Sequence, residues 1–216
     1  MSRLTPETVL SAYAAGIFPM SESADDPEIF WVEPEHRGVL PLDGMHISKR
    51  LARTVKQDRF TVRCDTAFED VINLCAESAP DRPDTWINST IHDIFSELFA
   101  LGVAHSVEAW QDEELVGGLY GIALAGAFFG ESMFSRRSDA SKVALVHLVA
   151  RLNAGGFTLL DTQFTTPHLE SLGVVEISRN DYQARLAQAL KVQGDFTSLP
   201  SSVSGSAAMQ SITQTS

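Results

Sequence analysis

The sequence predicts a mixed α/β (α+β) fold in which helices cover a mostly antiparallel sheet. Hydrophobic residues recur with the 3.6-residue period of helices near both ends of the chain and with the two-residue period of strands in its middle. Hydrophobic residues make up 44% of the 216 residues and charged residues 20%, which is ordinary for a globular protein and too apolar for a disordered one. The length suits one domain, or one domain with a small appendage.

The first helix is predicted by its end signals. Thr5 is a suitable N-cap, Pro6 occupies the first helical position, and Gly16 ends the helix. An acidic, polar loop at residues 21–28 follows an apolar turn and suits a boundary between two parts of the chain. We therefore expect a small N-terminal domain over residues 1–35.

Three further helices are expected before the sheet. Residues 48–57 predict the first, with basic and apolar side chains on opposite sides. Thr66 and Glu69 have the spacing of a capping box and would open the second. Asn88 or Ser89 would open the third, which ends at Gly102. The apolar stripes of the last two helices are interpreted as core.

The middle of the chain has the pattern of strands. Residues 105–110, 115–124 and 127–134 predict three strands joined by short turns, which together form an antiparallel meander. Residues 139–153 then predict an almost wholly apolar helix, and residues 157–164 predict another strand. Because helix and strand alternate here, we expect the helix to cover one face of the sheet.

The character of the chain changes at residue 201. A last helix is expected to start at Asn180, and the main domain is expected to span residues 36–200. Residues 201–216 consist mainly of Ser, Thr, Gln and Ala, carry no charge and show no periodicity. Such a segment cannot bury enough apolar surface to order itself, so we expect a disordered tail over residues 201–216.

Charge, cysteine content and missing motifs exclude several classes of protein. With 16 Lys+Arg and 28 Asp+Glu, the net charge of −12 argues against a protein that coats nucleic acid indiscriminately. Two cysteines without neighbouring histidines cannot build a structural zinc site, and the N-terminus lacks the apolar core of a signal peptide. We expect a cytoplasmic protein with no metal and no membrane span. The motifs of dinucleotide enzymes, phosphate-binding loops and serine hydrolases do not occur.

Two polar side chains end the last predicted strand. Asp161 and Gln163 share one face of this strand, after apolar residues that lead up to them. A carboxylate two positions from an amide can accept a hydrogen bond from the amide NH2 group and turn the amide oxygen towards a substrate. The pattern therefore indicates a pair of side chains that positions a substrate. The alternative is that Asp161 only caps the turn at residues 165–167.

An isolated carboxylate, Glu131, lies inside an otherwise apolar strand. A buried carboxylate requires a partner. Arg136, Arg137, Lys142 or a cationic substrate could supply it. An internal salt bridge is thus the structural alternative to a role in binding or catalysis.

Seven segments, taken together and in order, carry a resemblance. They are residues 12–19 (AYAAGIFP), 46–48 (HIS), 85–87 (TWI), 104–108 (AHSVE), 115–121 (LVGGLYG), 129–135 (FGESMFS) and 161–163 (DTQ). The most specific is the GESMFS string with Asp-x-Gln about 30 residues later. The chain resembles the bacterial leucyl/phenylalanyl-tRNA-protein transferases over residues 4–197, which is nearly everything except the tail.

The resemblance implies both a fold and an activity. The implied fold has a small N-terminal domain and a C-terminal domain similar to the acyltransferases of the N-acetyltransferase (GNAT) superfamily. Such enzymes move leucine or phenylalanine, sometimes methionine, from aminoacyl-tRNA to the α-amine of proteins that begin with Arg or Lys. This addition marks those proteins for degradation by the N-end rule. No metal or organic cofactor is implied.

The resemblance also gives roles to the polar residues. An aminoacyl ester is already activated, and an α-amine with a pKa of about 7.7–8.0 is partly neutral at pH 7, so direct aminolysis is expected. Gln163 would accept a hydrogen bond from the attacking amine, and Asp161 would orient Gln163. Glu131 would lie in the same site and contact the aminoacyl-adenosine or the incoming amine.

The remaining residues implied by the resemblance bind the aminoacyl-tRNA. Trp86 and Ser132 are expected near the terminal adenosine. An apolar pocket for leucine or phenylalanine would be wide and poor in polar groups. The residues expected to line it are Leu119, Phe128, Met133, Leu148 and Leu160.

The tRNA is expected to dock locally, because the net charge of −12 repels its phosphates and attracts an acceptor that begins with Arg or Lys. The dense basic face of the helix at residues 48–57 is the expected place, and a merely solvated face is the alternative. Its residues are Lys49, Arg50, Arg53 and Lys56. We expect the protein to act as a monomer.

The chain departs from some family members in two ways. It begins directly at the first helix, without the N-terminal extension of longer members, and Met20 stands where some relatives carry Trp. Two other functions remain as alternatives. An acyl-CoA-dependent N-acetyltransferase would need a loop for the CoA pyrophosphate, usually rich in glycine, and residues 135–138 contain none. A non-catalytic adaptor for basic N-termini would bind peptides without turnover.

Overall fold

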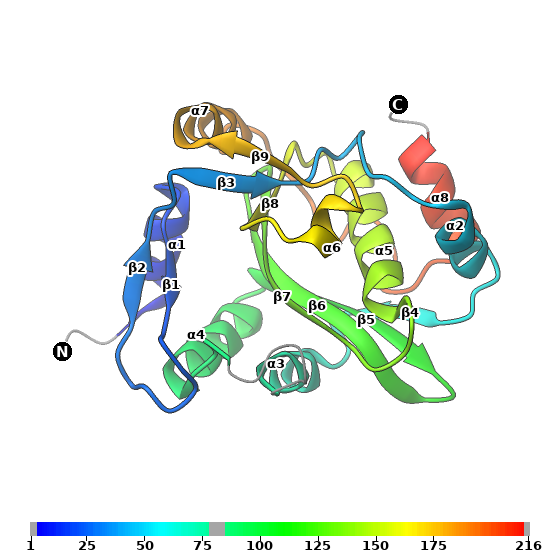
Figure 1. Cartoon of the computed structure of the whole chain (residues 1–216), viewed down its shortest axis with the longest axis horizontal. Coiled ribbons are helices and arrows are strands. Elements are labelled where there is room, and N and C mark those ends of the chain that lie inside the picture. Colours follow the sequence, from blue (N-terminus) through cyan, green and yellow to red (C-terminus); the bar gives the residue numbers. More distant parts are fainter. Residues whose placement is uncertain (1–3, 78–84, 214–216) are drawn as a thin grey trace.

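A twisted sheet forms the centre of the molecule, and helices cover both of its faces (Figure 1). The computed structural model describes residues 4–77 and 85–213. Within these residues the sheet has seven strands, and all neighbours are antiparallel except β7 and β8. The predicted mixed fold is confirmed. In spatial order the strands are β4 (Thr61–Cys64), β5 (Ala104–Gln111), β6 (Glu114–Leu124), β7 (Ala127–Ser135), β8 (Leu159–Gln163), β3 (His36–Val39) and β9 (Val175–Ser178).

Each face of the sheet has its own core, because successive residues of a strand point to opposite faces. Phe128 packs in one core and Phe129 in the other. The first core is covered by α2 (Lys49–Lys56), α5 (Ala140–Ala154) and α8 (Gly205–Thr213), and the second by α1 (Pro6–Ala14), α3 (Phe68–Ala76), α4 (Ser89–Ala100) and α7 (Arg179–Ala189).

In the part of the chain that the structure describes, none of the helices has both the length and the apolar character needed to span a membrane.

The N-terminal unit consists of α1 and a hairpin of β1 (Phe18–Met20) and β2 (Phe30–Val32). The predicted cap of α1 is confirmed, since the Thr5 side chain accepts a hydrogen bond from the Thr8 amide at 3.3 Å. The ring of Tyr13 meets Phe129 of the sheet edge-on, with 5.0 Å between the ring centroids. The N-terminal unit therefore shares a core with the main sheet.

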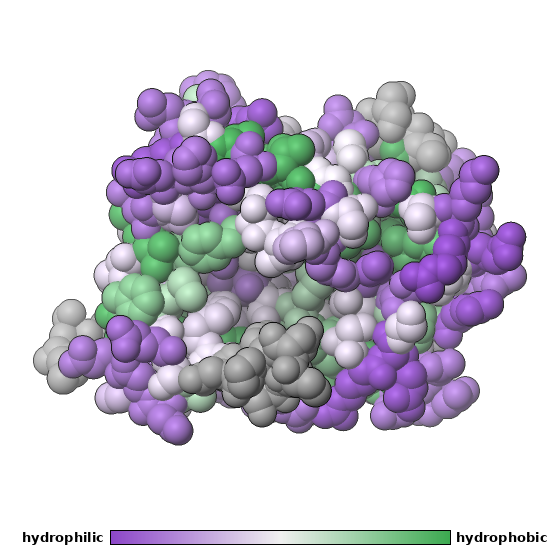
Figure 2. All heavy atoms as spheres, in the orientation of Figure 1, coloured by the Kyte–Doolittle hydropathy of each residue, from purple (hydrophilic) through white to green (hydrophobic). Residues whose placement is uncertain are grey.

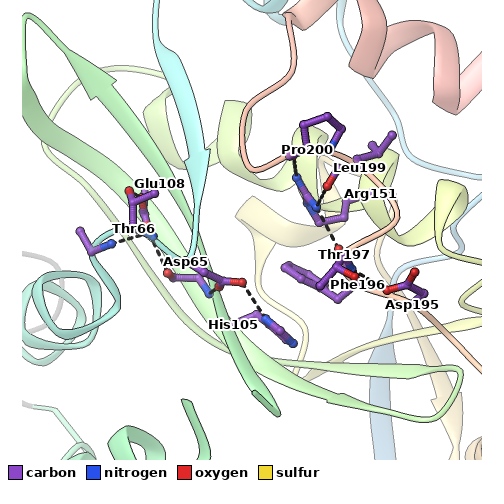
Figure 3. Close-up of polar contacts among 12 residues, drawn as sticks. Asp65, Thr66, His105, Glu108, Arg151, Asp195, Phe196, Thr197, Leu199 and Pro200 are labelled. Carbon is purple, nitrogen blue, oxygen red and sulfur yellow. Dashed lines mark hydrogen bonds and ion pairs between the residues drawn. The ribbon is translucent and has the colours of Figure 1, made fainter. Parts of the chain in front are cut away.

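The predicted capping box of α3 is wrong. Ala67 is the N-cap of this helix and makes no side-chain cap. The buried carboxylate of Glu108 on β5 instead accepts hydrogen bonds from the amides of Thr66 and Ala67, at 2.8 and 2.9 Å, and from the Thr66 hydroxyl (Figure 3). A neighbouring strand thus satisfies the first turn of the helix, which the local sequence could not reveal.

The expectation of a disordered tail from residue 201 is wrong for the described part of that segment. Arg151 of α5 donates hydrogen bonds to the carbonyls of Phe196 and Leu199, at 2.9 and 2.8 Å, and to that of Pro200 (Figure 3). Helix α8 follows and buries Ala208 against α2 and α5. The mostly polar composition of this segment hid one apolar stripe on α8. This stripe packs on α2 and α5, and that contact orders the helix.

Matched substitutions in α8 test this docking. Ala208→Asp places a charge in the core and is expected to lower the free energy of unfolding by about 2–4 kcal/mol. Ala207→Asp puts the same residue on the exposed side of α8 and should cost about 0.5 kcal/mol, close to the difference in helix propensity. Urea unfolding measures both values. If both substitutions lower the free energy of unfolding by the same small amount, α8 does not pack on the domain.

Candidate active site

An irregularity in β7 positions Glu131. Gly121 of β6 pairs with Gly130, whereas the preceding residue, Tyr120, pairs with Ser132. Glu131 is therefore the extra residue of a β-bulge, which breaks the regular alternation and turns its side chain out of the sheet pattern. Bulges of this kind are common beside active sites. The isolated carboxylate in an apolar strand is thus explained by a local change of register.

A cavity opens where β7 and β8 stop pairing. Their last parallel pair is Phe129 and Asp161, and residues directly beyond it on both strands line a cavity of about 240 Å³. Short helix α6 (Pro167–Glu170) and helix α5 complete its wall. The lining side chains are mostly apolar, with a few polar groups among them. The apolar ones are Leu119, Met133, Leu145, Leu148, Leu160 and Leu169, and the polar ones include Glu131, Ser132, Thr162, Thr166 and His168.

Four of the five residues expected to line an apolar pocket do line this cavity, and Phe128 does not. Phe128 is fully buried and stacks on Phe196, with 5.6 Å between the ring centroids. Ser132, which was expected near the adenosine, also lines the cavity. Trp86 is half-buried against the second core, away from the cavity lining.

Asp161 lies at the centre of a buried network on β8. Its carboxylate accepts hydrogen bonds from Arg37 Nε at 2.9 Å and Arg37 Nη2 at 2.7 Å, and from the Tyr182 hydroxyl at 2.6 Å. Arg37 and Asp161 expose 1% and 0% of their side chains, so this ion pair is screened from water. The third nitrogen, Arg37 Nη1, donates to the carbonyl of Gly16 at the end of α1. One ion pair thus connects β3, β8, α7 and the N-terminal unit.

Asp161 also holds the backbone of Gln163. The Gln163 amide donates a hydrogen bond to Asp161 Oδ1 at 2.7 Å, and Gln163 has a φ of +61°. A left-handed backbone costs a non-glycine residue about 1–3 kcal/mol unless its surroundings hold it in place. β3 approaches the same turn closely, since a Cβ atom on Gly38 would lie 2.7 Å from Thr162 Oγ1. Asp161 and β3 together fix the end of β8.

Glu131, and not Asp161, orients the side chain of Gln163. Gln163 Nε2 donates a hydrogen bond to Glu131 Oε2 at 2.9 Å, and both side chains are buried. The expectation that Asp161 binds this amide directly is therefore wrong, because both Asp161 oxygens are already engaged. Since the NH2 group faces Glu131, the oxygen on the other arm of the planar amide is left to accept a hydrogen bond from a substrate.

Burial changes the proton affinities of this network. It raises the pKa of Glu131 to about 8, although contacts with Tyr13 and Gln163 favour the charged form. Burial on its own would lower the pKa of Arg37, but the hydrogen bonds and charge of Asp161 outweigh it and raise that pKa. Burial, reinforced by the charge of Asp161, raises the pKa of Tyr182, so its phenol stays protonated and donates.

Comparison with known proteins shows the family of the chain. The family model of the leucyl/phenylalanyl-tRNA protein transferase N-terminal domain matches residues 2–35, and the model of the transferase itself matches residues 39–187. The chain belongs to the leucyl/phenylalanyl-tRNA protein transferase family. Members of this family are aminoacyltransferases.

Individual transferases are similar over nearly their whole length. A leucyl/phenylalanyl-tRNA–protein transferase of Paramagnetospirillum magneticum is 63% identical over 88% of this chain and 91% of the relative. One from Afipia carboxidovorans is 61% identical over 92% of this chain and 88% of the relative. One from Maricaulis maris is 57% identical over 97% of both chains.

The other charged residues singled out in the sequence lie outside the cavity. Arg136 and Arg137 pair with Glu77 and Glu114, at 2.7 and 3.3 Å, instead of with Glu131. The basic face of α2 is exposed. Its residues are Lys49, Arg50, Arg53 and Lys56, and Arg50 also pairs with Asp139 at 2.8 Å.

Arg37, Tyr182 and Tyr13 were not predicted from the sequence as residues of this site. Arg37 lies 124 positions from Asp161 in the chain, in a strand of four residues that is too short to show a period. Tyr182 has an ordinary place in an amphipathic helix. The one signal that pointed to a buried cation was Asp161 itself, because a carboxylate on an apolar strand face requires a partner.

The buried ion pair can be tested by unfolding. Arg37→Met leaves Asp161 charged and unpaired, which is expected to cost about 3–5 kcal/mol of stability. Adding Asp161→Asn removes the unpaired charge and should recover at least about 1 kcal/mol of that loss. Arg63→Met, which removes an exposed partner of Glu113, serves as control and should cost about 1 kcal/mol or less. If Arg37→Met costs no more than this control, the pair does not hold the site together.

Proposed function

We propose that this chain carries out the reaction of its family, the transfer of leucine or phenylalanine, and also methionine, from aminoacyl-tRNA to the α-amine of proteins that begin with Arg or Lys. The observation that carries the proposal is the hydrogen bond of 2.9 Å by which Glu131 orients the Gln163 amide beside an apolar cavity. This arrangement combines a binding site for an apolar amino acid with a group that aims an amine at its ester.

The apolar part of the cavity would take the side chain of the donor amino acid. Leu119, Leu148 and Leu160 supply rigid apolar walls, and Met133 has a flexible side chain that accommodates both a branched aliphatic group and a ring. Phe128 packs in the same core as these residues. Because Glu131 lines this cavity and also accepts a hydrogen bond from Gln163, the aminoacyl ester would be placed next to Gln163.

The chemistry is direct aminolysis. The lone pair of the acceptor nitrogen forms the new amide bond to the ester carbonyl carbon, and the bond from that carbon to the ribose oxygen breaks. The nitrogen loses a proton, and the leaving oxygen gains one. Gln163 accepts a hydrogen bond from the amine and aligns it. Glu131, with a pKa of about 8 that matches the amine's value of about 7.7–8.0, can take the proton that the amine loses.

The tRNA would approach from the side of α2. A hollow of about 170 Å³ between α2 and α5 is lined by Ser48, Arg50 and Lys142, and also by Ser171 and Leu172 just after α6. Since α6 also borders the cavity, a strand held at the basic face of α2 could reach the catalytic residues along this helix. Phosphate contacts of this kind position nucleic acid without reading its bases.

We also propose that the protein works as a monomer in the cytoplasm, with Trp86 near the terminal adenosine. The hydrogen bonds that complete the catalytic site come from one chain. The donor, aminoacyl-tRNA, is a cytoplasmic molecule in bacteria. No cofactor is needed for aminolysis of an activated ester.

A transfer assay tests the proposed reaction and site. Labelled leucine or phenylalanine should pass from charged tRNA to an Arg-initiated peptide and not to a Gly-initiated one. Gln163→Ala should lower kcat by about 100-fold, the lower range for a group that positions or moves a proton. Gln188→Ala, on the exposed side of α7, is the control and should leave kcat unchanged.

Each unexpected outcome has a distinct meaning. Absence of transfer from every charged tRNA would contradict the proposed reaction and favour a non-catalytic adaptor for basic N-termini. If the Gln163→Ala protein transfers at the rate of the Gln188→Ala control, the proposed reaction still holds, but Gln163 takes no part in it.

A further inference from the structure

A second and larger hollow lies on the opposite face of the N-terminal hairpin from the catalytic residues. On one face of the hairpin, the ring of Phe18 contacts the Arg37 guanidinium at 4.5 Å and meets Phe164 edge-on at 5.7 Å. Its neighbour Pro19 pairs with Trp31, so Trp31 belongs to the other face. Trp31 lines a hollow of about 770 Å³ between the hairpin, α1 and α4, which we call the N-terminal groove.

The groove has an apolar floor and an acidic rim. Leu4, Ile29 and Ile94 contribute apolar surface, and Trp31 is 41% exposed, an unusual fraction for so large a side chain. The charged residues among the described lining are all carboxylates, namely Glu28, Asp93 and Glu97. Asp93 and Glu97 lie one turn apart on the same side of α4.

The net negative charge of the chain is also concentrated in the N-terminal part. Residues 1–35 carry seven carboxylates and one arginine, which is a net charge of −6 and half of the chain's −12. The basic face of α2 lies at the other end of the molecule (Figure 1). Figure 2 shows apolar residues at the surface over the β1–β2 hairpin and hydrophilic residues along the outer edge at α2. The two ends therefore favour partners of opposite charge.

We propose that the N-terminal groove binds the acceptor polypeptide downstream of its N-terminal residue and selects acceptors with lysine or arginine there. This inference rests on the proposed function. Three carboxylates around a groove repel tRNA phosphates and attract basic side chains, and the exposed ring of Trp31 can stack against an ammonium or guanidinium group. The apolar floor receives the aliphatic parts of the same side chains.

The position of the groove fits this role. An extended polypeptide covers about 3.3 Å per residue, and a chain whose amine meets Gln163 would pass the two-stranded hairpin before it enters the groove. Residues within roughly ten positions of the acceptor's N-terminus would be read there. The groove would thus extend acceptor choice beyond the first residue.

The test compares transfer to Arg-initiated peptides at saturating phenylalanyl-tRNA. The probes are a dipeptide, which is too short to reach the groove, and two twelve-residue peptides that carry either lysines or alanines at positions five to eight. The lysine peptide should have a KM about fivefold to tenfold below that of the alanine peptide, as expected for a few exposed cation–π and ion-pair contacts. Asp93→Asn/Glu97→Gln, and separately Trp31→Leu, should abolish this difference.

A matched variant separates local docking from general attraction. Asp112→Asn/Glu113→Gln removes the same two charges from the exposed turn between β5 and β6 and should leave the KM ratio of the lysine and alanine peptides as in the wild type. If both double variants lose the KM difference between the two peptides to the same extent, long-range electrostatic attraction explains the preference, and the groove is not the binding site. Equal KM values for the two peptides in the wild type would also overturn it. Loss of transfer to the dipeptide in the wild-type protein would instead count against the proposed function itself.

Discussion

The buried pair of Arg37 and Asp161 is the interaction on which the rest of the site depends. Two charges with at most 1% exposure are stable only when their hydrogen bonds are satisfied, and here the guanidinium uses all three nitrogens and the carboxylate both oxygens. Because the partners of the pair come from α1, β3, β8 and α7, these elements must assemble before the charges are compensated. Packing of the N-terminal unit onto the sheet and the conformation at the end of β8 are therefore coupled through this pair.

Two carboxylates divide the task of holding one glutamine. Asp161 binds the backbone amide of Gln163 and keeps its left-handed conformation, while Glu131 binds the side-chain amide and decides which arm faces the substrate. Their environments differ accordingly. Among the residues that the structure describes, Asp161 forms an ion pair with Arg37, whereas Glu131 forms none, and burial raises the pKa of Glu131 to about 8. In the proposed reaction, Asp161 has the structural role and Glu131 is the group that can exchange a proton with the amine.

Local patterns predicted most of the helices and the meander, because these features follow from hydrophobic period and end signals within a few residues. Thr5, Asn88 and the alternation around Leu119 are examples. The residues of the apolar cavity were expected from the resemblance to the family, and not from local patterns. Features that depend on distant partners were not predicted. Arg37 gives no local signal, the cap of α3 comes from Glu108 on another strand, and α8 is ordered by α2 and α5 rather than by its own composition.

The side-chain amide signal of Gln163 in 15N-labelled protein, followed between pH 6 and pH 9, tests whether Glu131 orients Gln163. Gln163→Ala identifies the signal by its loss. We expect a shift with a midpoint near the Glu131 pKa of about 8, and no such shift in Glu131→Ala. A signal that does not titrate, or that titrates equally in Glu131→Ala, would contradict this role of Glu131.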